Sequence, residues 1–404
     1  MLAIAVAGCG PGGLAAALFL HRAGHRLTLF ERFDTPRPLG SALILQPAGL
    51  AVLASLGLSA PAIAIGARIE RLFGRAAPSG RVVLDVRYAD LPGEAFGVGI
   101  HRAALFGLLF DAVAGEAIPI ETGREIVASD PAAGGCRDLR FADGAIAGPF
   151  DLVVDALGTQ SPLAGRPPTP LDFGALWATL DWEDGFDAAA LDQRYRRARK
   201  MVGILPIGRM PGGGVRKAAF FWSLRGADLA RWRAEGLAPW KDEVRALWPE
   251  VAPLLDRIVD ADQMTFARYC HRTLRRPVEP GLVHLGDAWH STSPQLGQGA
   301  NMALLDAAAL DAALATGESI PAALARYQKL RRRHVRLYQL MSYAFTPFYQ
   351  SHGRILPFLR DHMVGPLSRV PPVPRLLAAI VAGALVAPLA GLPFGGPETK
   401  ARAR

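Results

Sequence analysis

The chain has 404 residues, half of them hydrophobic, so it can bury a large core and form about two or three domains. Its 45 Lys and Arg exceed its 36 Asp and Glu, but the arginines are scattered and lack the interleaved aromatic side chains of a nucleic-acid platform, which argues against nucleic-acid binding. Cys9, Cys136 and Cys270 lie far apart with no C-x-x-C pair, which argues against a disulfide framework and against a metal site.

The N-terminus has the pattern of one βαβ unit. Leu2 to Ala7 is an apolar run that predicts a buried strand, Gly13 to Ala23 has helical spacing, and His25 to Glu31 returns to strand character. Since the apolar run is short and runs directly into glycines, without a basic region or a cleavage site, it does not indicate a signal peptide. We therefore expect a cytoplasmic protein.

The turn inside this unit matches G-x-G-x-x-G, as Gly8-Cys9-Gly10-Pro11-Gly12-Gly13. In such a turn the first glycine allows the tight bend, the second lets the backbone approach a pyrophosphate, and the last permits close packing of the helix on the strand. Glu31 follows about 20 residues later, where a carboxylate can hold the hydroxyls of an adenosine ribose. We predict a site for FAD or NAD, and not for NADP, formed by Gly8, Gly10, Gly12, Gly13 and Glu31.

The middle of the chain has a different pattern of apolar and polar residues. Asp151 to Ala156 predicts one more buried strand, whereas residues 171–270 alternate apolar and polar side chains, as in Leu176 to Trp182 and Arg216 to Leu224. This alternation is typical of half-buried antiparallel strands, so we expect a separate sheet that covers a binding pocket. The pocket residues are expected among Met201, Trp177, Phe220, Phe221 and Trp222, about half of which can face the pocket.

The C-terminal part begins with a predicted strand at Leu282 to Leu285 and a helix from Asn301 to Leu314. An uncharged stretch from Leu376 to Pro397 is interrupted by prolines, which favours a packed or interfacial helix of about a dozen residues over a membrane span. Because Arg369 and Arg375 stand just before it, we expect peripheral contact with an anionic membrane.

A long motif follows the second of these strands, from Gly286 to Asn301, with the sequence GDAWHSTSPQLGQGAN. It closely resembles the second FAD motif of the p-hydroxybenzoate hydroxylase family of flavin monooxygenases. The resemblance implies that Asp287 binds the ribityl chain and that Pro294 lies along the isoalloxazine. It also implies that the loop and helix start give backbone N–H groups to the flavin, from Gly297, Gln298, Gly299, Ala300 and Asn301.

Other segments extend the resemblance, which covers about residues 1–60, 98–165 and 280–320. It carries FAD contacts to Arg32 and Arg102, and it places Gln46 beside the flavin ring. One motif departs from the family, because Leu157 stands where an aspartate usually serves both FAD and NAD(P)H. This departure weakens the expected use of a nicotinamide more than the expected use of FAD.

The resemblance implies a Rossmann-like α/β FAD-binding domain with an inserted mixed or antiparallel sheet domain for the substrate, followed by C-terminal helices. We place the boundaries at 1–170 and 271–325 for the FAD-binding domain, 171–270 for the inserted sheet, and 326–404 for the helical region with the apolar tail. No second G-x-G-x-x-G has the strand and helix around it that a separate NAD(P)H domain needs.

The implied activity is that of a single-component monooxygenase. NADH or NADPH would reduce FAD, and O2 would add to the flavin to form a hydroperoxide that hydroxylates or epoxidises an apolar or aromatic small molecule. The sequence offers no convincing catalytic base. Two alternatives stay open, namely an FAD-dependent reductase or dehydrogenase acting on a lipid or isoprenoid, and a flavin-binding module without turnover.

Overall fold

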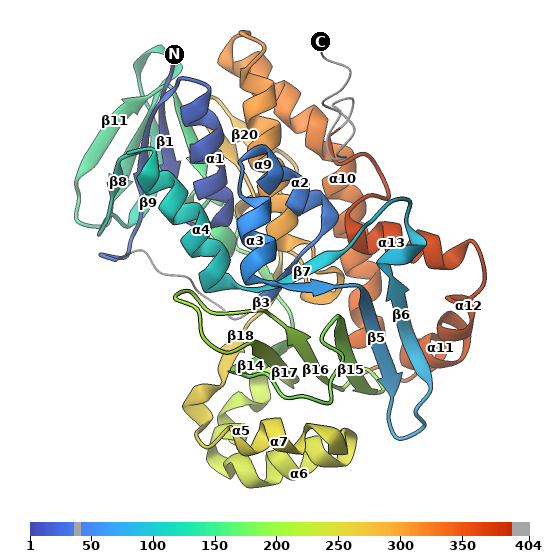
Figure 1. The fold of residues 1–404 in the computed structure, drawn as a ribbon. Coiled ribbons are helices and arrows are strands. Elements are labelled where there is room, and N and C mark those ends of the chain that lie inside the picture. The colour runs from blue at the N-terminus through green and yellow to red at the C-terminus, as the bar shows by residue number, and fades with distance from the viewer. Residues whose placement is uncertain (36–41, 390–404) are drawn as a thin grey trace.

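The computed structural model describes residues 1–35 and 42–389. Its first unit is built on a six-stranded sheet with the order β20-β21-β12-β1-β2-β8, in which all neighbours are parallel except the β20–β21 pair (Figure 1). The predicted strands and first helix of the βαβ unit are present. The strands are β1 (Ala3–Ala7), β2 (Arg26–Phe30), β8 (Ile120–Glu121), β12 (Leu152–Asp155), β20 (Val278–Glu279) and β21 (Leu282–His284).

Different structures cover the two faces of this sheet. One face packs on α1 (Pro11–Arg22), α4 (Arg102–Gly115) and α9 (Gly299–Leu314), with Ile4 and Val6 in the shared core. The other face packs on a small antiparallel sheet of β9 (Ile126–Pro131), β10 (Arg137–Phe141) and β11 (Ile146–Phe150), where Ala5 and Ala7 point. Because β1 is buried on both faces, it appears in the sequence as a continuous apolar run.

The second unit is a seven-stranded sheet with the order β18-β14-β17-β16-β15-β5-β6, antiparallel except for the parallel pair of β15 and β5. Two of its strands come from residues that we expected in the first FAD-binding segment, so the two units interleave more than the predicted boundaries state. The strands are β5 (Arg71–Ala76), β6 (Val82–Arg87), β14 (Phe173–Asp181), β15 (Ala190–Arg196), β16 (Lys200–Pro206), β17 (Lys217–Arg225) and β18 (Thr265–Ala267).

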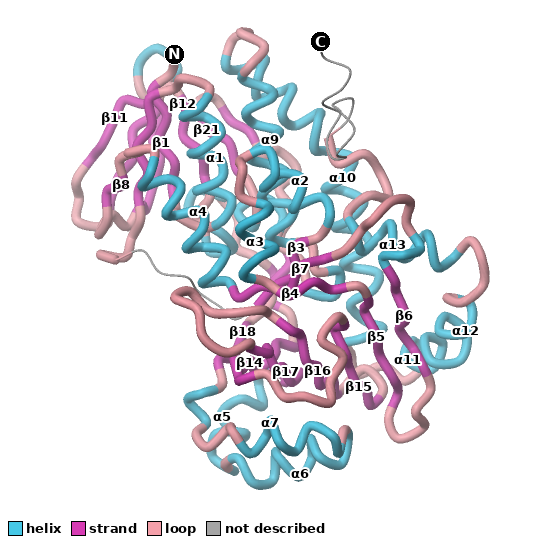
Figure 2. The backbone as a smooth tube through the Cα atoms, in the orientation of Figure 1, coloured by secondary structure: helices cyan, strands magenta, loops and turns pink. Residues whose placement is uncertain are grey.

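Three helices that the sequence analysis did not predict cover the far face of this sheet (Figures 1 and 2). They are α5 (Leu229–Glu235), α6 (Leu237–Leu247) and α7 (Ala252–Asp256). With them in place, β17 is buried at every position from Ala218 to Leu224. The expectation of half-buried strands is therefore wrong here, because the alternating side chains enter two different cores instead of a core and solvent.

A short antiparallel sheet joins the two units. It consists of β3 (Ala42–Leu45), β7 (Gly97–His101) and β4 (Ala67–Ile69), with α2 (Pro47–Ser55) and α3 (Ser59–Ile65) between β3 and β4. A Cβ on Gly99 would lie 2.1 Å from the carbonyl oxygen of Pro206, so this glycine allows β7 to approach β16 closely. A further two-stranded sheet pairs β13 (Thr169–Pro170) with β19 (Cys270–His271).

The C-terminal region is helical, as expected. It contains α10 (Ile320–Tyr349), α11 (Ile355–Leu359), the π-helix η9 (Arg360–Val364), α12 (Gly365–Leu367) and α13 (Val373–Ala382). α13 ends at Gly383, whose φ of +80° is left-handed, and residues 390–397 of the predicted apolar stretch lie outside the described residues. Among the described residues, no helix is long and apolar enough to cross a bilayer.

Candidate functional site

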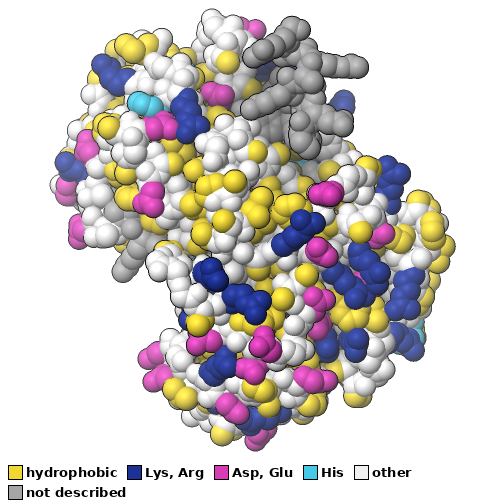
Figure 3. Space-filling view, viewed as in Figure 1, with side chains coloured by type: hydrophobic (Ala, Val, Ile, Leu, Met, Phe, Trp, Pro, Cys, Tyr) yellow, Lys and Arg dark blue, Asp and Glu magenta, His cyan; other side chains and the backbone are white. Residues whose placement is uncertain are grey.

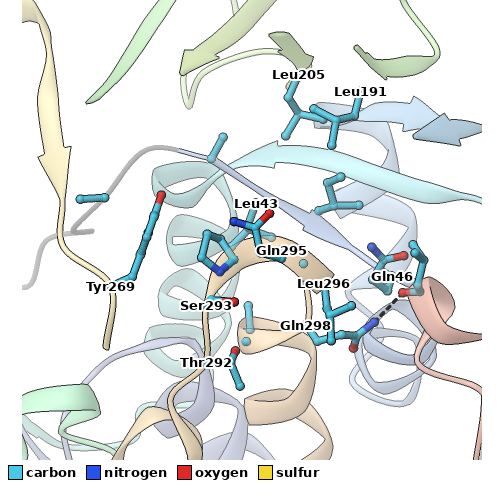
Figure 4. Close-up of a pocket in the computed structure, with 18 of the residues that line it drawn as sticks. Leu43, Gln46, Leu191, Leu205, Tyr269, Thr292, Ser293, Gln295, Leu296 and Gln298 are labelled. Atoms are coloured by element: carbon cyan, nitrogen blue, oxygen red, sulfur yellow. Dashed lines mark hydrogen bonds between the residues drawn. The ribbon is translucent and has the colours of Figure 1, made fainter. Parts of the chain in front are cut away.

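A cavity of about 440 Å³ lies between the two units, and both contribute to its wall. In Figure 4 the loop that carries Thr292, Gln295 and Gln298 lies on one side, while Leu191 and Leu205 of the large sheet lie on the other. The lining residues come from positions between Gly10 and Val381, so the cavity brings together segments that are far apart in the chain. Most of the predicted FAD residues line it, namely Gly10, Gly12, Arg102, Asp287, Pro294, Gly297, Gln298, Gly299 and Ala300.

Two helices begin at this cavity. Neither Gly10, the N-cap of α1, nor Gln298, the N-cap of α9, uses a side chain to cap the first N–H groups. Uncapped N–H groups at a helix start attract phosphates and other anions. No described heavy atom lies within 4 Å of a Cβ built on Gly10, so the backbone there is open to a ligand. These features fit a dinucleotide with its pyrophosphate over α1.

Gly8 and Gly13 of the turn are required by the local backbone geometry. Gly8 has a φ of +100°, which side chains rarely tolerate, so the tight bend needs glycine. A Cβ on Gly13 would lie 2.1 Å from the carbonyl oxygen of Gly8. With any larger residue at this position, α1 could not pack on β1 as it does. Gly8 and Gly13 do not line the cavity, and they shape it indirectly.

Glu31 ends β2 beside this turn. Its carboxylate accepts the backbone N–H of Cys9 at 3.1 Å and that of Phe33 at 3.3 Å. Burial, followed by the nearby charge of Glu31, raises the pKa of Cys9 to about 12, which keeps this cysteine a neutral thiol. Arg32 is exposed and stacks on the ring of Phe33. Neither Glu31 nor Arg32 is part of the cavity wall, and their FAD contacts stay predictions.

Asp287 begins the short helix α8 (Asp287–His290) and lines the cavity. Among the described residues its carboxylate accepts one side-chain hydrogen bond, from the hydroxyl of Thr159 at 3.4 Å, so it has capacity for further donors. This is the arrangement that a ligand hydroxyl requires. The assignment of Asp287 to the ribityl chain remains a prediction that this geometry supports.

A buried charge cluster holds the loop before Asp287. The carboxylate of Asp306 on α9 accepts the N–H of Gly286 at 2.8 Å, contacts His290 at 2.6 Å and pairs with Arg331 of α10 at 2.7 Å. Burial alone would raise the pKa of Asp306, but His290 and Arg331 hold it below its ordinary value. We did not predict this cluster from the sequence, although a carboxylate inside an apolar helix could have indicated a buried ion pair.

Asn301 connects the loop before α9 to the end of β3 and the adjacent Gln46. The Asn301 amide donates to the carbonyl oxygens of Ile44 and Gly297 and accepts the N–H of Gln46, so its side chain binds protein. Only its backbone is free for the predicted role. Gln46 accepts the Tyr88 hydroxyl through Oε1, while its buried Nε2 has no partner among the described residues. Since Gln46 lines the cavity, this N–H2 group is a donor available to a ligand.

The part of the wall that comes from the large sheet is uncharged and mostly apolar, with Gln193 and Tyr195 of β15 as its polar members. Trp177, Met201 and Phe221 line it, and Tyr269 closes one side with its hydroxyl accepting the Trp177 indole N–H at 3.0 Å. Burial raises the pKa of Tyr269 to about 12, so its hydroxyl stays neutral. Among the described residues of the cavity wall, only Arg102 and Asp287 are charged, and both belong to predicted FAD motifs. The described residues also contain no cluster of metal-ligating side chains.

Two of the predicted pocket residues are wrong. Phe220 and Trp222 point away from the cavity into the core beneath the sheet, where the Phe220 ring lies 6.1 Å from Trp240. Successive side chains of a strand face opposite sides, so Phe221 faces the cavity when its two neighbours do not. The sequence could not decide this choice of face, because both faces of β17 are apolar and buried.

Leu157 replaces an expected acid, and the nearby Asp155 does not take its place. Asp155 is fully buried, and its carboxylate accepts the Ser161 hydroxyl at 2.6 Å and contacts His284 at 2.6 Å. It therefore ties β12 to β21. Among residues 155–161, only Ala156 and Gly158 line the cavity.

Comparisons with known proteins agree on one family. A model described as FAD binding domain matches residues 1–123 and 215–340, more than half of the chain. The 3-amino-4-hydroxybenzoate 2-monooxygenase of Streptomyces cremeus is 28% identical over 81% of this chain and 82% of that protein. The FAD-dependent urate hydroxylase of Klebsiella pneumoniae is 27% identical, covering 82% and 86%. The crystal structure of Klebsiella pneumoniae HpxO with FAD and uric acid has a TM-score of 0.79 at 22% identity, covering 95% and 98%, which shows a shared fold.

Proposed function

This chain belongs to the FAD binding domain family, and on that premise we propose that it is a single-component FAD-dependent monooxygenase of uncharged apolar or aromatic small molecules. The observation that carries the proposal is the composition of the cavity wall. Residues of the FAD motifs form one side, and an apolar sheet surface forms the other, so a flavin and an organic substrate can lie in contact. Relatives named as monooxygenases and hydroxylases support this activity.

The protein residues bind, orient and exclude water. The helix starts at Gly10 and Gln298 would hold the phosphates and the pyrimidine end of FAD, Asp287 would hold the ribityl chain, and Gln46 would offer its free N–H2 group. Bound FAD supplies the redox chemistry, taking a hydride from a nicotinamide and activating O2 for transfer of one oxygen atom. The apolar sheet keeps bulk water from that reaction.

We propose NADH or NADPH as a transient reductant, as is typical of this family. The sequence has no second dinucleotide fold, and Leu157 cannot accept a hydrogen bond, so the nicotinamide must use the same cavity face as the substrate. We also propose residence in the cytoplasm, which the three free cysteines suit. The relatives named as monooxygenases and hydroxylases do not favour the alternative of a dehydrogenase.

The composition of the cavity wall favours an uncharged substrate. A carboxylate in the apolar half would have no cationic partner, because Arg102 belongs to the FAD side, and an unpaired buried charge costs several kcal/mol. We expect 2-naphthol to stimulate NADPH oxidation at least about tenfold more than 6-hydroxy-2-naphthoate, with ¹⁸O from ¹⁸O2 in the product. Oxygen uptake and mass spectrometry measure both. Oxidised product without ¹⁸O would contradict the monooxygenase, whereas preference for the carboxylate would contradict only the substrate class.

Adjacent residues on β17 provide a test of the pocket. Phe221→Ala enlarges the cavity and removes one aromatic contact, so we expect substrate affinity to fall by about ten- to a hundredfold. It also lowers stability, because the buried Phe221 ring packs on Trp177. Phe220→Ala empties a site in the other core, so we expect a loss of about 3–5 kcal/mol in the free energy of unfolding with unchanged affinity in the folded protein. Urea unfolding and substrate titration separate the two effects. Equal effects of both changes on affinity would refute the assignment of faces.

A further inference from the structure

The C-terminal segment between Ile355 and Leu376 exposes an unusual density of apolar side chains. Fourteen large hydrophobic side chains are exposed among the described residues, and six of them lie in this one segment. Single exposed apolar residues are ordinary, but a dense group on one segment marks an interaction surface. The six, here named the apolar surface, are Ile355 at 74%, Phe358 at 58%, Met363 at 62%, Leu367 at 55%, Val370 at 52% and Leu376 at 46% exposed.

Arginines border the apolar surface. A hollow next to it is lined by Arg71, Arg75 and Arg87 of the β5–β6 hairpin and by Arg369, and Figure 3 shows Lys and Arg side chains gathered over β5 and β6. Asp85 in this hollow pairs with Arg71 at 2.7 Å and with Arg87 at 3.3 Å.

Arg75 and Arg369 remain exposed, with no ion pair among the described residues. The only acid between residues 351 and 389 is Asp361, which pairs with the buried Arg360. Asp90 also lines the hollow, but its four arginines outnumber Asp85 and Asp90, so the border of the apolar surface carries a net positive charge.

The helix in which this segment ends, α13, also forms part of the cavity wall. Leu377 and Ile380 of α13 line the cavity, while Arg375 and Leu376 on the same helix are exposed. Behind the apolar surface, the guanidinium of Arg360 lies 4.8 Å from the ring centre of Tyr195 and 5.3 Å from that of Tyr349. Both tyrosines line the cavity.

We propose that the apolar surface and its arginine border dock on an anionic lipid bilayer. Apolar side chains with an arginine border are what a membrane interface binds, since the side chains enter the acyl boundary and the arginines meet phosphate headgroups. A second copy of the chain suits the surface less well, because a two-fold contact would bring the arginines of both copies to one interface. The docked face covers the wall of an apolar cavity, so a substrate dissolved in the bilayer would reach the enzyme there.

The test is vesicle flotation of the full-length, FAD-loaded protein, which needs no turnover and so is independent of the proposed reaction. We expect binding to phosphatidylcholine vesicles with 30% phosphatidylserine, and weak binding to pure phosphatidylcholine. Arg75→Ala with Arg369→Ala should lower the partition coefficient by about fivefold for each arginine. Ile355→Ser with Phe358→Ser should lower it about tenfold or more. The control is Ile146→Ser with Arg26→Ala, an equally exposed pair on the first unit, and should bind as the wild type does.

Two results would overturn the proposal. One is the absence of flotation with the serine lipid, or equal flotation of all variants. The other is a dimer by light scattering that Phe358→Ser dissociates, since a second copy would then cover the surface. Flavin absorbance and circular dichroism of each variant confirm that a lost signal is not lost folding.

Discussion

Asp306→Asn is expected to destabilise the protein by about 3–5 kcal/mol, because it leaves the guanidinium of Arg331 buried without a counter-charge. Asp306 and Arg331 are both fully buried and 2.7 Å apart, so no water can replace the lost partner. The amide also weakens the contact with His290 and the hold on the Gly286 N–H, and so loosens the loop that presents Asp287. Urea unfolding at neutral pH gives the loss of stability, and titration with FAD gives the loss of affinity.

Asp311→Asn is the matched control, on the same helix α9. Burial raises the pKa of Asp311 to about 6, so its charge opposes folding and its removal should leave stability unchanged or higher. An Asp306→Asn protein that unfolds at the wild-type urea concentration would show that the cluster contributes little. A protein that loses stability but keeps full FAD affinity would limit Asp306 to folding.

Asp287→Ala is expected to weaken FAD binding by about a hundredfold, so that the purified variant is nearly colourless. A carboxylate that accepts a ligand hydroxyl contributes about 1.5–3 kcal/mol, and Asp287 is the only acid among the described residues that line the cavity. Folding should be kept, because the side chain makes only the one long contact with Thr159. Flavin absorbance after purification, followed by fluorescence titration of the apoprotein with FAD, measures the change.

Asp111→Ala serves as the control, since Asp111 is exposed on α4 and does not line the cavity. It should keep wild-type flavin content. If Asp287→Ala also binds FAD with wild-type affinity, Asp287 has no role in holding the flavin. The release of FAD by acid from the wild type tests whether the flavin is non-covalent, as the absence of any expected attachment residue predicts.

The local sequence determined the FAD-binding half of this protein. The βαβ unit, its glycine turn and the GDAWHSTSPQLGQGAN motif are contiguous patterns whose geometry is set within about 30 residues, and the family match confirmed the FAD prediction. Gly8 and Gly13 show the reason. The positive φ of Gly8 and the 2.1 Å approach at Gly13 both arise within the turn itself, and both favour glycine there. Such constraints are visible in the chain itself.

Tertiary structure alone decided several other features. It placed β5 and β6 beside β15, although more than 100 residues separate them, and it covered the far face of β17 with α5, α6 and α7. It thereby chose Phe221 over Phe220 and Trp222 for the cavity. It also buried Asp306 against Arg331 and folded part of the apolar tail into the cavity wall as α13. Strand pairing, the choice of face and charge pairing join residues distant in the chain, so no local pattern carries them, and packing settles them by the apolar area that each arrangement buries.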